Sequence, residues 1–137
     1  MTEEQVRVLV VDDEETVRNL LQRILKEVGY DVATAANGQE ALAKMAELKP
    51  GVVLLDIKMP GMSGMEVLQQ IRTNWPETCV VMATAAADVQ TAVEAMTKGA
   101  YDYITKPFNR DDLLLKVQRA AEKRDYLWRL LKNFGTP

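Results

Sequence analysis

The sequence predicts an α/β protein with a doubly wound, five-stranded parallel sheet, the (βα)5 arrangement. Apolar stretches typical of strands alternate with amphipathic stretches of helical period along the 137-residue chain. Some strands are apolar almost throughout, as in Val52–Leu55, which indicates burial on both faces and therefore a parallel sheet covered by helices. Right-handed crossovers leave few topologies, and of these we favour the strand order 2-1-3-4-5.

The first half of the chain opens with a strand at Arg7–Val11 and a helix at Glu14–Val28. One apolar stripe runs along that helix, made of Val17, Leu20, Leu21, Ile24, Leu25 and Val28. A second strand follows at Asp31–Ala35. Asn37 then caps a helix that runs to about Leu48, since an Asn side chain can accept from free amide groups in the first turn.

The second half continues the alternation. Its strands are predicted at Val52–Leu55, Thr78–Ala83 and Tyr101–Ile104. Its helices are predicted at Met65–Arg72, at Val89–Lys98 and beyond Asn109. Asn109 caps the last helix, and Asp111 and Asp112 suit the positive end of its dipole. The whole pattern is that of a flavodoxin-like sheet, in which the first and third strands are neighbours.

The composition is that of an ordinary globular domain and narrows the function classes. A net charge of −3 and a pI near 5.1 do not favour direct nucleic-acid binding. Cys79, the single cysteine, lies in an apolar strand and is expected to be a small buried thiol. The N-terminus lacks the pattern of a signal peptide, and no stretch approaches the ~20 apolar residues of a membrane span. We therefore expect a cytoplasmic protein with no membrane contact.

Three acidic residues follow two strands that the topology makes neighbours. Asp12 and Asp13 come after the first strand and Asp56 after the third, so their carboxylates should share the carboxyl edge of the sheet. Three carboxylates in one crevice repel one another unless a cation lies between them, and an open oxygen site suits Mg²⁺. Asp13 and Asp56 are predicted as direct ligands, Asp12 as a ligand directly or through water, and the Lys58 backbone carbonyl as a further ligand. Capping of the next helix is the alternative use of Asp12 and Asp13.

Two further polar residues follow strands at the same edge. Lys106 precedes Pro107, and a cis bond there would turn its side chain inward over the acids. Its ammonium can pair with a phosphoryl oxygen or with a resting carboxylate. Thr84 has small neighbours on both sides, and its hydroxyl can donate to an incoming phosphoryl oxygen.

Several motifs then match one family in order. Val-Asp-Asp-Glu (11–14), Leu-Leu-Asp-Ile-Lys-Met-Pro-Gly-Met-Ser-Gly (54–64), Ala-Thr-Ala (83–85) and Tyr-Asp-Tyr-Ile-Thr-Lys-Pro-Phe (101–108) resemble the motifs of bacterial response-regulator receiver domains. The resemblance covers residues 6 to about 124. Within the family, the chain looks most like the receivers of nitrogen-regulation-type activators.

The resemblance implies a phosphoacceptor switch rather than an enzyme with a separate substrate. Asp56 would accept a phosphoryl group from a sensor histidine kinase, with Mg²⁺ bound by Asp12 and Asp13 and with Lys106 contacting the phosphate. Thr84 and Tyr103 would form the switch pair. Their rearrangement would change the surface made by the fourth helix, the fifth strand and the fifth helix, through which the family can pair as a homodimer.

The tail divides the chain at residue 124. Residues 1–124 form the receiver, and residues 125–137 form a helical extension or the start of a linker to an output domain beyond residue 137. A heptad-like seam, broken by Arg124, comprises Leu113, Val117, Ala120, Leu127 and Leu131. One possibility is that this helix packs on its own domain. The other is that it acts as a signalling helix, which pairs with a second copy or leads into an output domain. We favour the signalling helix, because Trp128 and Phe134 have no evident core to fill.

Other functions are compatible with parts of this pattern. A haloacid-dehalogenase-like phosphohydrolase also uses an Asp nucleophile and Mg²⁺, but requires Asp-x-Asp where this chain has Asp12-Asp13. A flavin-binding flavodoxin needs a first loop rich in Ser, Thr or Gly, whereas residues 12–15 are all acidic. A receiver-like scaffold that binds partners without phosphorylation stays open as the third alternative.

Overall fold

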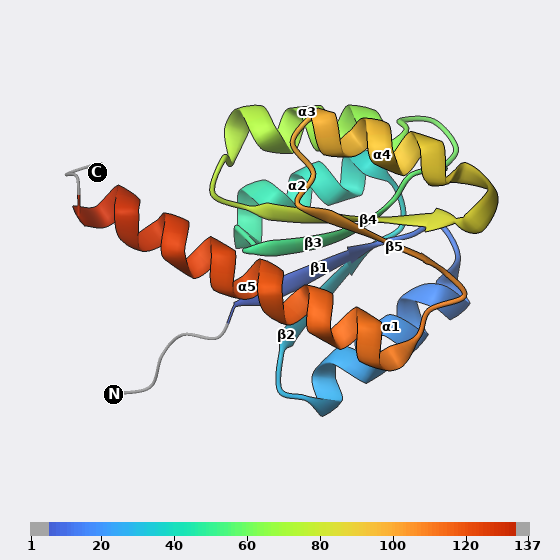
Figure 1. The fold of residues 1–137 in the computed structure, drawn as a ribbon, viewed down its shortest axis with the longest axis horizontal. Helices are drawn as coiled ribbons and strands as arrows, with labels where there is room; N and C mark the ends of the chain where they lie inside the picture. Colours follow the sequence, from blue (N-terminus) through green and yellow to red (C-terminus); the bar gives the residue numbers. More distant parts are fainter. Residues whose placement is uncertain (1–5, 134–137) are drawn as a thin grey trace.

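The structure, a computed structural model, describes residues 6–133 and places five strands in one parallel sheet of order β2-β1-β3-β4-β5 (Figure 1). The strands are β1 Arg7–Val11, β2 Asp31–Ala35, β3 Val52–Asp56, β4 Cys79–Ala85 and β5 Asp102–Lys106. The helices are α1 Glu15–Glu27, α2 Gly38–Leu48, α3 Gly64–Asn74, α4 Val89–Thr97 and α5 Arg110–Asn133, with a short 3₁₀ turn, η1 Ala86–Asp88, before α4. The predicted fold class and strand order are confirmed.

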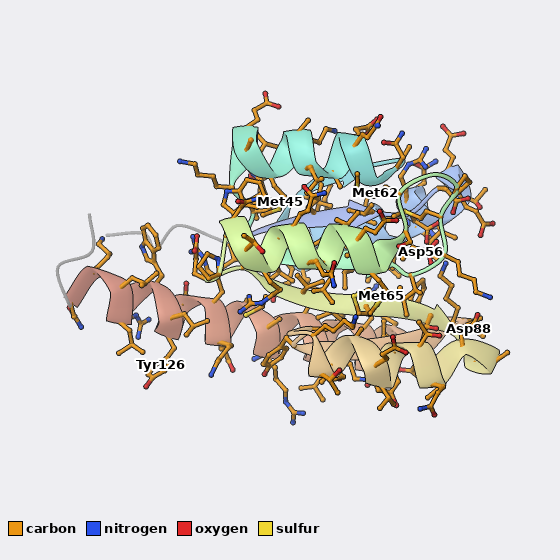
Figure 2. The ribbon with its side chains drawn as sticks, turned by 90° about the horizontal axis from the view of Figure 1, so that it is seen from above. Met45, Asp56, Met62, Met65, Asp88 and Tyr126 are labelled. Carbon is orange, nitrogen blue, oxygen red and sulfur yellow. The ribbon has the colours of Figure 1, made fainter. Side chains whose placement is uncertain are left out.

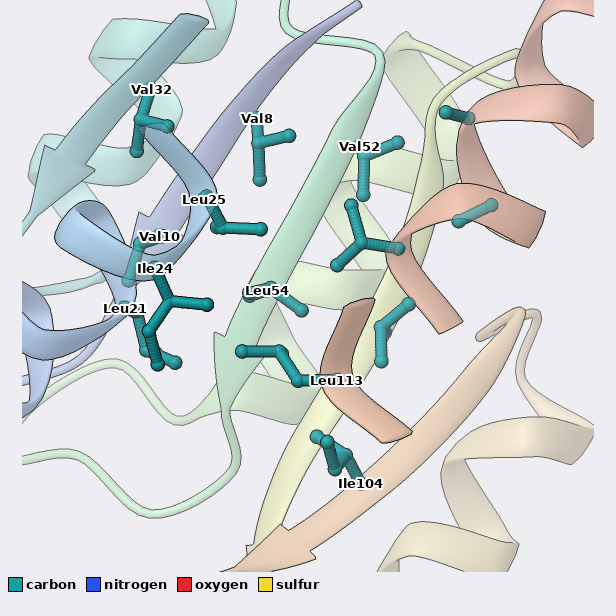
Figure 3. Close-up of a cluster of buried hydrophobic side chains, with 14 of the residues drawn as sticks. Val8, Val10, Leu21, Ile24, Leu25, Val32, Val52, Leu54, Ile104 and Leu113 are labelled. Carbon is teal, nitrogen blue, oxygen red and sulfur yellow. The ribbon is translucent and has the colours of Figure 1, made fainter. Parts of the chain in front are cut away.

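Helices cover both faces of the sheet, and each face has its own core (Figure 1). On the α1 and α5 face, Leu25 and Leu113 pack against Val8 and Val10 of β1 and Ile104 of β5 (Figure 3). The α2, α3 and α4 face is filled by a second cluster that includes the side chains Met45, Leu68, Ile71 and Met82. All five residues of the central strand β3 are buried, in agreement with the apolar run Val52–Leu55 that precedes Asp56.

The caps follow the local sequence. Asn37 accepts from the Glu40 amide and Asn109 from the Asp112 amide, as predicted. Helix α3 begins at Gly64, one residue before the predicted start, because Ser63 and Glu66 form a capping box.

Strand ends differ from the predictions in a way that matters for function. Asp56 is the last residue of β3, Thr84 lies inside β4, and Lys106 is the last residue of β5. These polar residues were expected to follow their strands. They belong to the strands because each is held in register with a neighbouring strand, as Asp56 is with Ala83 and Thr84 with Thr105.

Helix α5 is the longest helix described and continues without a break past Arg124. Its seam residues Leu113, Val117 and Ala120 are buried in the core of this same domain, and Leu127 packs against that core. Trp128 is exposed by 42% and makes contacts with the cations of Arg124 and Lys132. Phe134 lies outside the described residues. Four of the five seam residues therefore pack on this same domain, and Leu131 is not part of that core. The end of α5 projects beyond the sheet (Figure 1).

Two smaller observations complete the description of the fold. Cys79 is buried, as predicted. Within residues 6–133, none of the helices combines the length and the apolar character that crossing a membrane requires.

Candidate functional site

The pairing of β1 with β3 brings the three acidic residues to one place. Asp12 directly follows β1, and Asp56 ends β3 beside it. One carboxylate oxygen from each of Asp12, Asp13 and Asp56 lies within 4.8 Å of the other two. Asp12 and Asp56 are buried, with 1% and 6% exposure, whereas Asp13 is exposed to solvent. The cluster is thus closed on the protein side and open on one side to water.

Lys106 reaches this cluster from β5, across the width of two strands. Its Nζ atom lies 2.9 Å from Asp12 Oδ2, to which it donates a hydrogen bond, and 3.5 Å from Asp56 Oδ1. The Lys106–Pro107 peptide bond is cis. The structure therefore brings together all four charged side chains that the sequence placed at this edge.

The titration of Asp56 reflects this crowding. Burial, followed by the negative charge of Asp12, raises the pKa of the Asp56 carboxyl from its usual 3.8 to about 6, although Lys106 acts in the opposite direction. For Lys106, burial alone would lower the pKa, but the hydrogen bond to Asp12 and the charge of Asp56 outweigh it and raise the pKa. One ammonium thus compensates only part of the negative charge of three carboxylates.

The donor set fits a hard divalent cation. Carboxylate oxygens are the ligands that Mg²⁺ prefers, and it commonly keeps several waters, for which the exposed Asp13 side leaves access. Burial and the negative charge of Asp12 raise the pKa of Asp56, so a cation bound beside it would favour the ionised carboxylate. Lys58 lines the same cleft as Asp56, and its role as a carbonyl ligand stays a prediction.

A cleft of about 230 Å³ opens beside Asp56. Its walls include Glu14, Lys58, Thr84, Asp88 and Lys106. Thr84 is 2% exposed, and its hydroxyl donates only to the carbonyl of the next residue, Ala85, at 3.2 Å. A group that enters the cleft next to Asp56 would take the place of the Ala85 carbonyl as the acceptor of this proton.

Tyr103, the second proposed switch residue, does not line this cleft. It is partly buried and packs against the cluster under α2, α3 and α4. Because side chains alternate along a strand, Tyr103 shares that face with Met82, its partner in register, and hence with Thr84. The two proposed switch residues thus occupy the same face of neighbouring strands, with the tyrosine outside the walls of the cleft.

Several site contacts escaped the sequence analysis. The Lys58 Nζ atom forms a 3.1 Å ion pair with Asp88 Oδ1, which joins the loop after β3 to the start of α4. Figure 2 shows Asp88 at the same end of the molecule as Asp56, with Tyr126 toward the other end. Nothing in the sequence pairs these two residues, because the contact depends on where two loops meet.

Asp12 also has a second use at this site. Its Oδ1 accepts from the Glu14 amide at 2.9 Å, and its backbone carbonyl accepts from Arg18 at 2.7 Å. Asp12 thus holds the turn before α1 through Oδ1 while Oδ2 meets Lys106. It does not cap the first turn of α1, whose N-cap residue is Glu14 without a side-chain cap.

Comparison with known proteins gives a consistent result. Residues 8–118 match the family model described as the response regulator receiver domain. The chain is 46% identical over 116 residues to the regulatory protein AtoC of Escherichia coli, covering 85% of this chain and 25% of AtoC. It is 43% identical over 113 residues to the DNA-binding transcriptional regulator NtrC of Salmonella typhimurium, covering 82% of this chain and 24% of NtrC. The chain thus spans about a quarter of the length of these relatives.

Solved structures show the same likeness. The receiver domain of NtrX from Brucella abortus is 41% identical, with a TM-score of 0.82 over 84% of this chain and 98% of that one. A longer NtrX structure from the same organism is 38% identical, with a TM-score of 0.87 over 96% of this chain and 30% of that one. Chemotaxis protein CheY4 of Vibrio cholerae is 34% identical, with a TM-score of 0.80 over 85% of this chain and 99% of that one.

Proposed function

This chain belongs to the response regulator receiver domain family, and from that premise we propose that it is a signalling switch whose phosphoryl acceptor is the Asp56 carboxylate. The observation that carries the proposal is the convergence of Asp12, Asp13, Asp56 and Lys106 at one sheet edge. A scaffold that only binds partners has no need of a buried, repulsive acid cluster.

In the proposed reaction, an Asp56 carboxylate oxygen attacks the phosphorus of a phosphohistidine on a sensor kinase. A P–O bond to Asp56 forms, the P–N bond breaks, and its electron pair stays on the imidazole nitrogen. Mg²⁺ bound by Asp12, Asp13 and Asp56, with the Lys58 carbonyl completing the set, would neutralise charge on the transferred group. The chain acts here as a phosphoacceptor, with only its own phosphorylation and dephosphorylation as chemistry.

Lys106 and Thr84 receive the new group. The Lys106 ammonium already faces Asp56 at 3.5 Å and would pair with a phosphoryl oxygen, while the Thr84 hydroxyl would donate to another. Movement of Thr84 toward the phosphoryl group would leave room for the Tyr103 ring on the same face. The expected result is a changed surface at α4, β5 and α5.

We further propose that residues 1–124 act as the receiver and that the chain from 125 leads toward an output domain. Coverage of this chain rises from 84% with the NtrX receiver alone to 96% with the longer NtrX chain, which supports a continuation of α5. Because NtrC is named a DNA-binding transcriptional regulator, the output proposed is control of transcription by a domain outside this chain. Pairing of two copies through α4, β5 and α5, or through the end of α5, is the proposed form of the active state.

Acetyl phosphate with Mg²⁺ tests the central proposal. We expect one hydroxylamine-labile phosphate per chain in the wild type and none in Asp56→Asn, as measured by intact mass. Asp88→Asn is the matched control, because Asp88 is the other aspartate lining the cleft and should leave labelling intact. Equal labelling of Asp56→Asn and the wild type would refute the assignment.

A further inference from the structure

One side chain that the proposed phosphotransfer does not use makes two contacts with Tyr103 and one with Asp112. Lys116 of α5 donates from Nζ to the Tyr103 backbone carbonyl at 2.6 Å. The same Nζ atom lies 5.4 Å from the centroid of the Tyr103 ring and 3.5 Å from Asp112 Oδ2, one turn earlier in α5. Its side chain is only 23% exposed, so this ammonium is held in place rather than free in water.

These contacts cross the edge of the sheet. Strand β5 is an edge strand, and the Tyr103 ring packs with the cluster under α2, α3 and α4. Lys116 comes from α5, whose buried residues fill the opposite face. Its ammonium therefore reaches around β5 from one face to meet a ring that belongs to the other.

The chemistry of these contacts restrains the ring. A cation over an aromatic face is attracted by the ring's quadrupole, and a charged donor makes a stronger hydrogen bond to a carbonyl than a neutral one. The ring contact needs the positive charge of Lys116 and the hydrogen bond is strengthened by it, while Asp112 keeps that charge close to β5. An inward movement of the ring, away from the sheet edge, would have to give up the cation contact.

We propose that Lys116 is a positioning residue that holds the Tyr103 ring at the open edge of the sheet, and so sets how readily the switch turns on. This inference rests on the proposed switch role of Thr84 and Tyr103. We call the two Lys116–Tyr103 contacts the clamp. In the unphosphorylated protein the clamp favours the position of the ring at the sheet edge, the outward position. Loss of the clamp shifts the equilibrium toward the inward ring without any change at Asp56.

The experiment uses the full chain with ¹³C-labelled tyrosine and the phosphoryl mimic beryllofluoride with Mg²⁺. The chain has four tyrosines, and Tyr103→Phe assigns the signals of Tyr103. Lys116→Met keeps the aliphatic length but removes the charge. In this variant, without beryllofluoride, we expect the Tyr103 signals to move toward their positions in the beryllofluoride-bound wild type. Its apparent beryllofluoride affinity should rise about two- to fivefold, the worth of one exposed cation–aromatic contact.

Two variants control for charge and for general effects on α5. Lys116→Arg retains the cation and should restore both wild-type signals and affinity. Lys123→Met removes a lysine of the same helix that lies 5.7 Å from the Tyr126 ring, and should leave Tyr103 unchanged.

The outcomes separate this inference from the function on which it rests. If beryllofluoride moves the Tyr103 signals of the wild type but Lys116→Met retains wild-type signals and affinity, the clamp is wrong and the switch stands. An equal response to Lys123→Met likewise overturns the clamp. If beryllofluoride does not shift the wild-type Tyr103 signals, the proposed switch role of Tyr103 is wrong, and the proposed clamp is wrong with it.

Discussion

The Nζ atom of Lys106 lies 2.9 Å from Oδ2 of Asp12, although 94 residues separate them in the sequence. Asp12 is almost fully buried and follows β1, whereas Lys106 ends β5. This contact ties the edge strand to the acid cluster at the centre of the sheet. Several measurable properties depend on it.

Lys106→Met should destabilise the metal-free protein, because it leaves the carboxylates of Asp12 and Asp56 without their cation. A loss of about 1–3 kcal/mol in the free energy of unfolding is expected at pH 7, less than for a fully buried pair since a quarter of the Lys106 side chain is exposed. Added Mg²⁺ should recover part of the loss. Urea unfolding with EDTA and with Mg²⁺ measures both effects. The exposed Lys98→Met is the control, and a loss as large in that variant would contradict the explanation.

The pH dependence of stability should report on Asp56. Its pKa of about 6 in the folded protein exceeds the usual 3.8, so the folded state binds this proton more tightly than the unfolded chain. The stabilisation is complete below pH ~4 and is lost as the pH rises through about 6. Metal-free Asp56→Asn should therefore exceed the wild type in stability by about 1–3 kcal/mol at pH 7.5, and by less at pH 5. Urea unfolding in EDTA at both pH values tests this, and a pH-independent gap would contradict it.

Asp13→Asn should weaken Mg²⁺ binding by at least about tenfold, because it replaces a charged ligand by a neutral amide in a site with few protein ligands. Asp13 is the exposed member of the cluster, so its substitution should leave the free energy of unfolding nearly unchanged. Isothermal titration calorimetry measures the affinity. Glu15→Gln, two residues further on and also exposed, is the matched control. A loss in Asp13→Asn no larger than in this control would remove Asp13 from the ligand set.

Gly64→Ala should be strongly destabilising, because a Cβ atom there would collide with the Asp56 carbonyl and would lie 2.8 Å from Ile57 Cα. The obstruction is backbone and cannot rotate away, so a cost of about 2–4 kcal/mol is expected. Gly61→Ala is the contrasting control, since its Cβ would meet nothing within 4 Å and only its positive φ of 77° opposes the change. It should cost about 1 kcal/mol. Equal losses in urea unfolding would show that close packing at Gly64 is not the cause.

The sequence by itself determined the number, type and order of the elements. The stripe that contains Leu21 and Leu25, the apolar run of β3 and the caps at Asn37 and Asn109 all act within a few residues, so they can be recognised without a fold. The parallel topology followed from that alternation, because right-handed crossovers leave few ways to connect it. With the topology in hand, residues 12, 13, 56, 84 and 106 could be assigned to a single edge.

Only the tertiary structure decided which side chains touch there. Pairing with neighbouring strands extended β3, β4 and β5 over Asp56, Thr84 and Lys106, and strand pairing is a long-range property. The Lys58–Asp88 and Lys116–Tyr103 contacts depend on how far a flexible lysine reaches between different elements that are packed together. The periodicity of a single segment carries no information about such contacts, since they exist only once the sheet and its helices are assembled.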